Sequence, residues 1–326
     1  MKAVQVTDFG TAKVLALTEL PDLEPGPGQV AIDVTHAAVG LIDVYLRQGL
    51  YEGRPGLPQP PYVPGLEVGG TVRALGEGVT DLAIGEKVVA LSASATGGYA
   101  SMYVSDRARV LSTQAYDLDP ALAVAVVPNA VMAHVALTGP IQLHPGERVL
   151  VHGAFGALAA TFPGIAKQLG AARVVGTVRS ERVAAAAASR LPYDQIVDSA
   201  TMLTVLGDEK FDVIVDPVGG QVRTESLKLL APGGRLLLVG NASGDWQHGV
   251  DGNGIWQGNF IVAGFNAGGY LPAHPEAVPA AAAAALTAAT SGLADTEIEL
   301  LPLGDAATAH ERLEDHTAQG RIVLVP

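Results

Sequence analysis

The chain has 326 residues, of which 48% are hydrophobic and 16% charged, and its formal net charge is −13. This length suffices for two domains with separate cores. The negative charge argues against nucleic acid and anionic membrane as partners, because an acidic surface repels both. The chain contains no cysteine, which excludes thiol nucleophiles, disulfides and cysteine-ligated zinc.

Targeting and membrane signals are not expected in this sequence. We identify no apolar run that approaches the ~18 residues needed to span a bilayer. No basic segment followed by an apolar one precedes the first predicted strand. A cytoplasmic protein without a membrane partner is therefore expected.

The N-terminal third contains short apolar segments separated by turns rich in glycine and proline. The segments 1–6, 29–34, 70–75 and 87–91 are predicted strands, several with period-two alternation. Short strands at this spacing are typical of a compact β-barrel. The composition changes near residue 119 and again around 264–269, and residues 320–326 are predicted to form an edge strand. A β domain interrupted by a second domain is the simplest arrangement.

Residues 148–170 have the pattern of strand, glycine turn and helix. Val149 to Val151 predict a buried strand, Gly153 and Gly156 a tight turn, and Ile165 with Leu169 a helix that follows it. This order is the first half of a dinucleotide-binding βαβ unit, in which glycines let the backbone approach a pyrophosphate at a helix N-terminus. The alternative is a doubly wound domain that binds no nucleotide.

The segments that follow support a parallel sheet. Apolar runs at 173–178, 195–198, 211–216 and 234–240 alternate with helix-forming stretches such as 181–190. Continuous apolar strands of this kind are covered by helices on both faces. The fold class predicted for this part is α/β.

The end of the second strand of this unit indicates which nucleotide is bound. No acidic residue follows the strand directly, whereas Arg179 and Arg182 flank Ser180. Two guanidiniums and a hydroxyl suit the 2′-phosphate of NADPH better than the free hydroxyl of NADH. Alternatively, both arginines are solvated residues at a helix start, and Glu181 pairs with one of them.

Five N-terminal motifs give the sequence a family resemblance. They are residues 40–51 (GLIDVYLRQGLY), 63–70 (VPGLEVGG), 76–79 (GEGV), 85–88 (GEKV) and 98–100 (GYA). With the glycine turn, they resemble the medium-chain dehydrogenase/reductase superfamily, in particular its zinc-free quinone oxidoreductase branch.

The resemblance implies a GroES-like catalytic β-barrel formed by residues 1–120 and 267–326, and a Rossmann NADP-binding domain with a doubly wound parallel sheet at 121–266. It also implies hydride transfer from NADPH to a quinone or an α,β-unsaturated carbonyl, usually by a homodimer.

Two positions indicate whether the chain can bind zinc. Zinc-dependent members carry a cysteine where this chain has Gly40 and a histidine where it has Leu66. Neither side chain present can ligate zinc, so no metal is expected. His134, His152 and His248 are interpreted as packing or surface residues.

The resemblance also supplies candidate catalytic residues. Tyr45 and Tyr51 match tyrosines of the active-site segment, where a phenol can donate a hydrogen bond to the reduced oxygen of a substrate. The alternative for each tyrosine is a core position with a local hydroxyl partner. Asp43 completes the catalytic set and is expected to order the segment.

The candidate cofactor-binding residues come from the glycine turn, from the ends of later strands and from the return to the barrel. They are Gly153, Phe155, Gly156, Ala157, Leu158, Thr177, Arg179, Arg182, Asn241, Phe265 and Asn266.

Three departures from the family pattern keep other functions open. Gly40 stands where zinc-free members usually have asparagine, Met132 where they have threonine, and Ala157 and Ala159 where the turn usually has glycine. The chain is therefore either a quinone or enone reductase, a tailoring reductase or cyclisation catalyst of secondary metabolism, or a redox-inactive member that acts as a binding protein.

Overall fold

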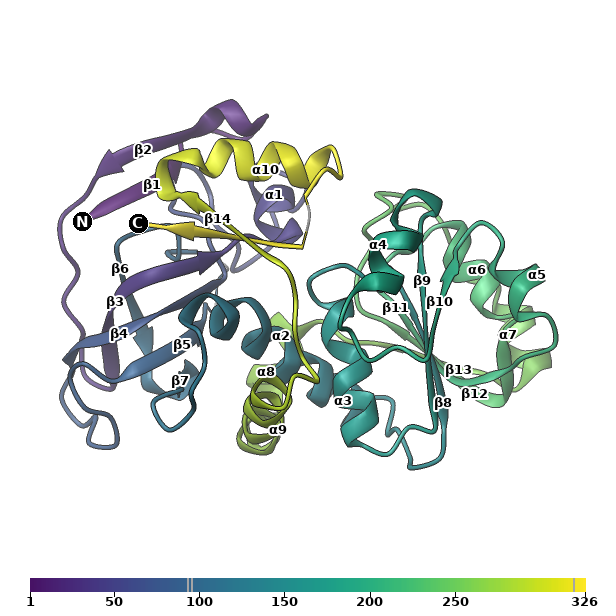
Figure 1. The fold of residues 1–326 in the computed structure, drawn as a ribbon. Helices are drawn as coiled ribbons and strands as arrows, with labels where there is room; N and C mark the ends of the chain where they lie inside the picture. Colours follow the sequence, from purple (N-terminus) through teal and green to yellow (C-terminus); the bar gives the residue numbers. More distant parts are fainter. Residues whose placement is uncertain (93, 95, 319) are drawn as a thin grey trace. The chain divides into compact units, whose positions relative to one another are not determined.

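The computed structural model describes residues 1–92, 94, 96–318 and 320–326. They form two compact units, which are considered separately (Figure 1). The first consists of Met1–Pro128 together with Thr296–Pro326, and the second of Asn129–Asp295. The chain thus returns to its first unit after it has completed the second.

Mostly antiparallel strands build the first unit. They are β1 (Lys2–Val6), β2 (Leu15–Glu19), β3 (Gln29–Ala38), β4 (Glu67–Leu75), β5 (Lys87–Leu91), β6 (Met102–Asp106), β7 (Val110–Ser112), β14 (Ile298–Pro302) and β15 (Arg321–Val325). β1 pairs with β2, and the larger sheet has the order β14-β15-β3-β4-β5-β7, with β6 also paired to β3. Val30, Ile32 and Val34 alternate along β3 and are buried together with Val68 and Val72 of β4. Period-two alternation thus places one face of this sheet in the core.

Short helices complete the first unit. They are α1 (Leu41–Arg47), α10 (Ala306–Glu314) and the single 3₁₀ turns η1 (Ala12–Val14), η2 (Arg107–Arg109) and η6 (Leu303–Asp305).

The prediction that the last segment is an edge strand is wrong. β15 pairs in parallel with β14 and in antiparallel with β3, so β14 occupies the outer position. The first four residues of β15, from Arg321 to Leu324, are all buried. A strand buried on both faces needs neighbours on both sides to satisfy its backbone groups.

The second unit contains a six-stranded, all-parallel sheet. Its strands are β8 (Arg148–His152), β9 (Arg173–Val178), β10 (Gln195–Asp198), β11 (Phe211–Asp216), β12 (Leu230–Leu238) and β13 (Ile261–Gly264). Their order is β10-β9-β8-β11-β12-β13. The chain winds outward from β8 in both directions, which is the order of a doubly wound dinucleotide-binding sheet. Sheets with this order usually bind their ligand at the carboxyl ends of the strands where the winding reverses, which here is at β8. The predicted α/β fold class is confirmed.

Helices connect these strands. α2 (Pro120–Thr138) begins within the residues of the first unit and ends within those of the second. The others are α3 (Phe162–Gln168), α4 (Val183–Ala188), α5 (Met202–Leu206), α6 (Gln221–Ser226), α7 (Gly252–Gly258), α8 (Ala267–Ala273) and α9 (Val278–Thr290), with the 3₁₀ turns η3 (Ala159–Thr161), η4 (Ser180–Arg182) and η5 (Pro275–Ala277).

The helix after the glycine turn begins later than its sequence pattern predicts. A turn and η3 follow β8, and α3 begins only at Phe162. Pro163 explains the delay, because proline lacks a backbone N–H and is accommodated in the first turn of a helix. The anion-binding capacity of this segment therefore depends on the turn and not on a long helix.

α2 corrects the statement that no apolar run is long enough to cross a membrane. Its 19 residues have a mean hydropathy of 1.8 in the most apolar window, so by length and composition it could span a bilayer. However, 83% of that window is buried inside the protein, as in the core helix of a globular fold.

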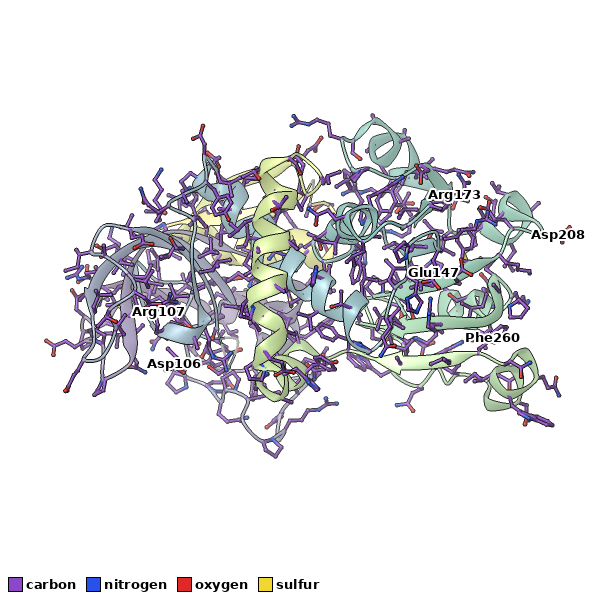
Figure 2. All side chains as sticks on the ribbon, turned by 90° about the horizontal axis from the view of Figure 1, so that it is seen from below. Asp106, Arg107, Glu147, Arg173, Asp208 and Phe260 are labelled. Atoms are coloured by element: carbon purple, nitrogen blue, oxygen red, sulfur yellow. The ribbon has the colours of Figure 1, made fainter. Side chains whose placement is uncertain are left out.

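Ion pairs occupy the amino ends of the parallel strands. Arg173 pairs with Glu209 at 2.7 Å, and Arg235 pairs with Glu147 at 2.5 Å; Arg173 and Glu147 are labelled in Figure 2. Each of these pairs links two strands that are separated by one strand in the sheet, β9 with the start of β11 and β12 with the start of β8. The opposite edge carries the glycine turn.

Candidate functional site

The glycine turn joins β8 to η3 at the point where the winding of the sheet reverses. Gly153 has a φ of +60°, a conformation that glycine adopts without strain. A Cβ at this position would lie 3.0 Å from Val218. Glycine is therefore required here both by the backbone and by the neighbouring loop.

The carbonyl groups of the turn are used inside the protein. The Gly153 carbonyl accepts the N–H of Gly156 at 2.8 Å, and the Gly156 carbonyl accepts that of Ala160 at 2.8 Å. The carbonyls of Ala154 and Ala159 both accept the Tyr193 hydroxyl.

The N–H groups between them are available. Within the described part of the chain, the backbone N–H groups of Phe155, Ala157 and Leu158 donate no hydrogen bond. Residues 155–158 are also partly or fully exposed. A turn in which several carbonyls accept internal hydrogen bonds while three nearby N–H groups remain free favours an anion.

The arginines expected to bind a phosphate have partners of their own. The guanidinium of Arg182 lies over the ring of Phe155, 5.4 Å from its centroid. Arg179 pairs with Glu181 at 3.2 Å, and both side chains are at least half exposed. The alternative in which Glu181 pairs with one arginine is therefore realised, although an exposed pair of this kind is weak.

Ser180 does not offer its proton to a ligand in this arrangement. Its hydroxyl donates to the Asp198 carboxylate at 2.5 Å, and this bond lowers the pKa of Asp198.

Thr177 belongs to a buried polar chain. Its hydroxyl lies 2.8 Å from Nδ1 of His152, and Nε2 of His152 lies 2.8 Å from the Ser226 hydroxyl. Ser226 donates its own proton to the Val222 carbonyl, so Nε2 of His152 carries the hydrogen and Nδ1 accepts from Thr177. The Thr177 side chain is thus used inside the fold, beneath the glycine turn.

Asn241 lies at the carboxyl end of β12, against the loop that follows β11. Gly219 has a φ of +77°, and a Cβ there would lie 2.0 Å from Oδ1 of Asn241. The Asp216 carboxylate accepts the N–H groups of Val218 and Gly219 at 2.8 and 2.7 Å, which fixes this loop.

Phe265 and Asn266 follow β13. The N–H of Phe265 donates to the Leu238 carbonyl at 2.9 Å, and its ring lies 5.2 Å from that of Tyr270. Asn266 caps α8 by accepting the N–H of Gly268 at 3.1 Å. The predicted cofactor-binding residues therefore all lie in the second unit, in the glycine turn, at the end of β9 or after the strands of its sheet.

Asp43 lies in α1 of the first unit and is fully buried. Its Oδ2 accepts the N–H of Gly40 at 2.8 Å and the hydroxyl of Tyr99 at 3.0 Å. The Tyr99 hydroxyl also lies 3.2 Å from Nε2 of His310. Burial raises the pKa of Asp43 to about 6. These contacts tie the start of α1 to the core.

Tyr45 and Tyr51 are half-buried neighbours in the first unit. Their ring centroids are 6.5 Å apart in an edge-to-face arrangement, and the Arg54 guanidinium lies 4.8 Å from the centroid of Tyr51. Burial raises the pKa of both phenols. Both hydroxyls therefore keep their proton at neutral pH.

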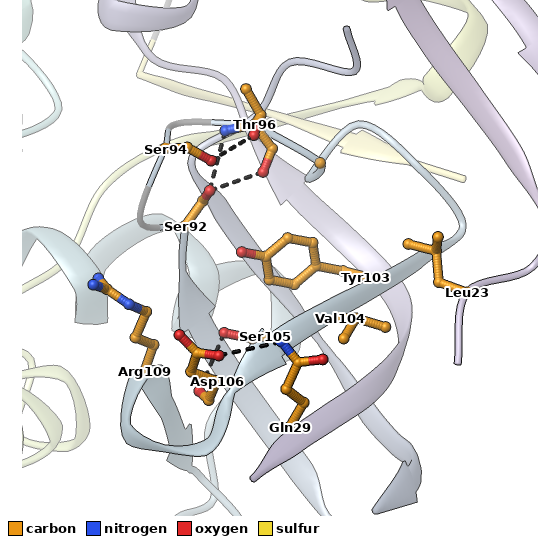
Figure 3. Close-up of a pocket in the computed structure, with 11 residues that line it drawn as sticks. Leu23, Gln29, Ser92, Ser94, Thr96, Tyr103, Val104, Ser105, Asp106 and Arg109 are labelled. Carbon is orange, nitrogen blue, oxygen red and sulfur yellow. Dashed lines mark hydrogen bonds between the residues drawn. The ribbon is translucent and has the colours of Figure 1, made fainter. Parts of the chain in front are cut away.

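The first unit also contains a cavity of about 320 Å³ (Figure 3). Polar side chains from the ends of β3, β5 and β6 line it, among them Ser92, Tyr103, Asp106 and Arg109. None of the three predicted catalytic residues lines this cavity.

The positions that hold zinc in related enzymes have other contacts here. Gly40 directly precedes α1. Leu66 is followed by Glu67, which forms a buried ion pair with Arg321. Among the residues that the structure describes, no three histidine, aspartate or glutamate side chains are grouped as metal ligands.

Sequence reasoning missed Tyr193, Asp216 and Arg223. Each acts through a contact that depends on the folded sheet, and Tyr193 lies 39 residues from Ala154, whose carbonyl it binds. Only the glycines at 219 and 220 gave a local signal, since they mark a loop with a special backbone conformation.

Two family models match the chain. The alcohol dehydrogenase GroES-like domain matches residues 26–115, and a model described as a zinc-binding dehydrogenase matches residues 169–324. Together they cover parts of both units.

Individual relatives span the full length. A quinone oxidoreductase of Pseudomonas aeruginosa is 30% identical over 100% of this chain and 99% of its own. The human synaptic vesicle membrane protein VAT-1 homolog is 27% identical over 100% of this chain and 86% of its own. The structure of an Escherichia coli quinone oxidoreductase complexed with NADPH superposes with a TM-score of 0.87, at 26% identity and with complete coverage of both chains.

These matches agree with the order of the parallel sheet and with the N-terminal motifs. The chain belongs to the quinone oxidoreductase branch of the medium-chain dehydrogenase/reductase superfamily.

Proposed function

We propose that the protein is an NADPH-dependent oxidoreductase that transfers a hydride to a quinone or an α,β-unsaturated carbonyl without zinc. The observation that carries the cofactor assignment is the turn at Gly153. Its N–H groups at Phe155, Ala157 and Leu158 are free, while the carbonyls of Gly153, Ala154, Gly156 and Ala159 accept internal hydrogen bonds. The E. coli relative crystallised with NADPH supports the same assignment.

The residues present fit this cofactor. The free N–H groups suit the pyrophosphate, and Gly156 leaves its approach open. Arg179 and Arg182 would bind the 2′-phosphate, with the exposed Glu181 displaced from Arg179. Asn241, Phe265 and Asn266 follow the strands on the nicotinamide side of the switch point, and Thr177 would support the turn from below.

Bound NADPH supplies the hydride, and the chain's own residues supply the rest. Tyr45 and Tyr51 keep their protons and so can donate a hydrogen bond to the reduced oxygen. Asp43 is fully buried, so its proposed role is to hold the segment that carries them. Gly40 and Leu66 support zinc independence, because neither side chain can ligate a metal. Polarisation of the substrate carbonyl would then depend on hydrogen-bond donors.

The organisation proposed with this function is that of the family. Residues 1–120 and 267–326 would form the catalytic domain and residues 121–266 the NADP-binding domain of a cytoplasmic enzyme. The compact units divide the chain differently, with residues 121–128 in the first unit and 267–295 in the second. A homodimer is supported by β13, which has no neighbour on its outer side among the described strands. Ile261 on β13 and Trp256 on α7 are 53% and 74% exposed. Light scattering after gel filtration tests the dimer.

Two measurements test the function. NADPH is titrated by its fluorescence, and its oxidation is then followed with 1,4-benzoquinone, 1,4-naphthoquinone and a panel of enones, with and without EDTA. We expect binding, turnover of at least one acceptor and no effect of the chelator. Absence of binding up to millimolar NADPH would contradict the reductase and favour a binding protein; binding without turnover would favour a tailoring reaction.

A further inference from the structure

Tyr193 precedes β10 and reaches back to the glycine turn. Its hydroxyl donates to the carbonyl oxygens of Ala154 and Ala159, at 3.2 and 3.1 Å. One proton is shared between two acceptors, which accounts for distances at the long end of the normal range. Burial raises the pKa of Tyr193 well above 10, so the phenol remains a donor.

The two carbonyls lie at the two ends of the segment that carries the free N–H groups. Ala154 precedes Phe155, and Ala159 follows Leu158. If it were released from Tyr193, the Ala154 carbonyl could rotate toward the ligand side and place a partial negative charge there. The Ala159 carbonyl also accepts the Phe162 N–H within η3, so the hydroxyl ties the Ala154 end of the turn to a carbonyl that η3 already holds.

The neighbouring residues provide space for this contact. A Cβ on Gly176 would lie 2.6 Å from Cβ of Ala154 and 3.0 Å from Cε1 of Tyr193, so only glycine lets the turn and the ring meet over β9. The tyrosine ring packs in a small apolar cluster with Ala154, Phe155 and Ile196. The hydroxyl is thus held in place by a packed ring.

We propose that Tyr193 is a positioning residue that preorganises the turn 153–159 for the pyrophosphate of the cofactor. This inference rests on the proposed function. Ala157 and Ala159 stand where family members usually have glycine. In this chain the Tyr193 hydroxyl, which comes from outside the turn, restrains the backbone conformation of the turn. A preorganised turn pays less ordering entropy when the anion binds.

The test uses Tyr193→Phe, with Tyr103→Phe in the first unit as the matched control. Both variants remove one hydroxyl from a largely buried ring, but Tyr103 belongs to the first unit, where its hydroxyl hydrogen-bonds with Ser92 and Ser105. We expect Tyr193→Phe to raise the Kd and the KM for NADPH about tenfold with little change in kcat, and Tyr103→Phe to leave all three unchanged.

A second readout does not depend on the cofactor. Hydrogen exchange of a peptide covering residues 153–160 in the cofactor-free protein should be faster in Tyr193→Phe than in the wild type and unchanged in the control. If the wild type binds NADPH and Tyr193→Phe binds it equally well, the inference is overturned while the proposed function stands. If the wild type itself binds no NADPH, both are overturned.

Discussion

Asp216 and Arg223 form an ion pair at the carboxyl end of β11, with Nε of Arg223 2.6 Å from Oδ2 of Asp216. The aspartate is fully buried and the arginine side chain is 12% exposed. Arg223 also donates to the Gly240 carbonyl at 2.8 Å. One side chain therefore joins the loop after β11 to the loop after β12, which carries Asn241.

Removal of this arginine should destabilise the protein strongly. Arg223→Ala leaves the Asp216 charge buried with only its two backbone donors, and breaking such a pair costs about 3 kcal/mol. Urea unfolding measures the loss. The control is Arg73→Ala, whose pairs with Asp22 and Asp33 are about half exposed and should contribute at most about 1 kcal/mol. Equal losses in both variants would contradict the prediction.

Charge at the expected 2′-phosphate site gives a second prediction. Glu181→Gln releases Arg179 and removes a repulsive charge, so the Kd for NADPH should fall about two- to fivefold, as expected for an exposed pair. NADH lacks the phosphate, and its Kd should not change. Glu311→Gln makes the same charge change in the first unit and serves as the control. An equal gain for NADH would show that Glu181 acts elsewhere.

Gly153 gives a third prediction, with a control glycine that also has a positive φ. Gly153→Ala and Gly146→Ala both place a side chain at positive φ, which costs about 1–2 kcal/mol. Only at Gly153 does the new Cβ also meet Val218, since Gly146 has nothing within 4 Å. Both variants should lose stability, and Gly153→Ala should in addition weaken NADPH binding at least tenfold. Isothermal titration distinguishes them, and equal NADPH affinities would contradict a role of the turn.

Most strands of the second unit could be predicted because they are apolar runs bounded by turn residues, whereas β13 was not predicted and β12 begins earlier than the predicted run 234–240. The predicted runs 173–178, 195–198 and 211–216 coincide with β9, β10 and β11. The late start of α3 could not be predicted from the same pattern. Pro163 hardly changes the spacing of the apolar residues, but it removes a backbone N–H and therefore fits only in the first turn of the helix. β15 was wrongly predicted to be an edge strand because nothing in the residues of β15 indicates that β14 pairs with it.

The candidate site was predictable only as a list of backbone positions. Gly153 and Gly156 indicate that a turn exists, but the direction of its carbonyls depends on Tyr193, which the fold brings from another connection. In the same way, the orientation of the Thr177 hydroxyl is set by its hydrogen bond with His152, which cannot be inferred from the position of Thr177 near the end of β9. Contacts between side chains distant in sequence leave no local pattern.

Asp43 gives a prediction about pH. Burial raises its pKa from 3.8 to about 6, so between these values the native state binds more protons than the unfolded state. The free energy of unfolding should therefore fall as the pH rises through this window, by about 3 kcal/mol for a shift of this size. Asp43→Asn cannot titrate, so the stability of the wild type relative to this variant should decline by that amount between pH 4 and 7. The exposed Asp315→Asn is the control and should show no such trend.

His152 should act in the opposite direction. Burial lowers its pKa from 6.5 to about 4, so the unfolded state binds the proton first as the pH falls. The neutral His152 ring makes its full contribution to the free energy of unfolding above pH 6.5. This contribution should decline by about 3 kcal/mol as the pH falls to 4. His152→Gln can still contact Thr177 and Ser226 through its amide but does not titrate. Its unfolding free energy should lie below that of the wild type at pH 7, and the difference should shrink on acidification. His144→Gln changes an exposed ring and should follow the wild type at every pH. A difference between wild type and His152→Gln that stays constant with pH would show that the proton is not excluded from this buried chain.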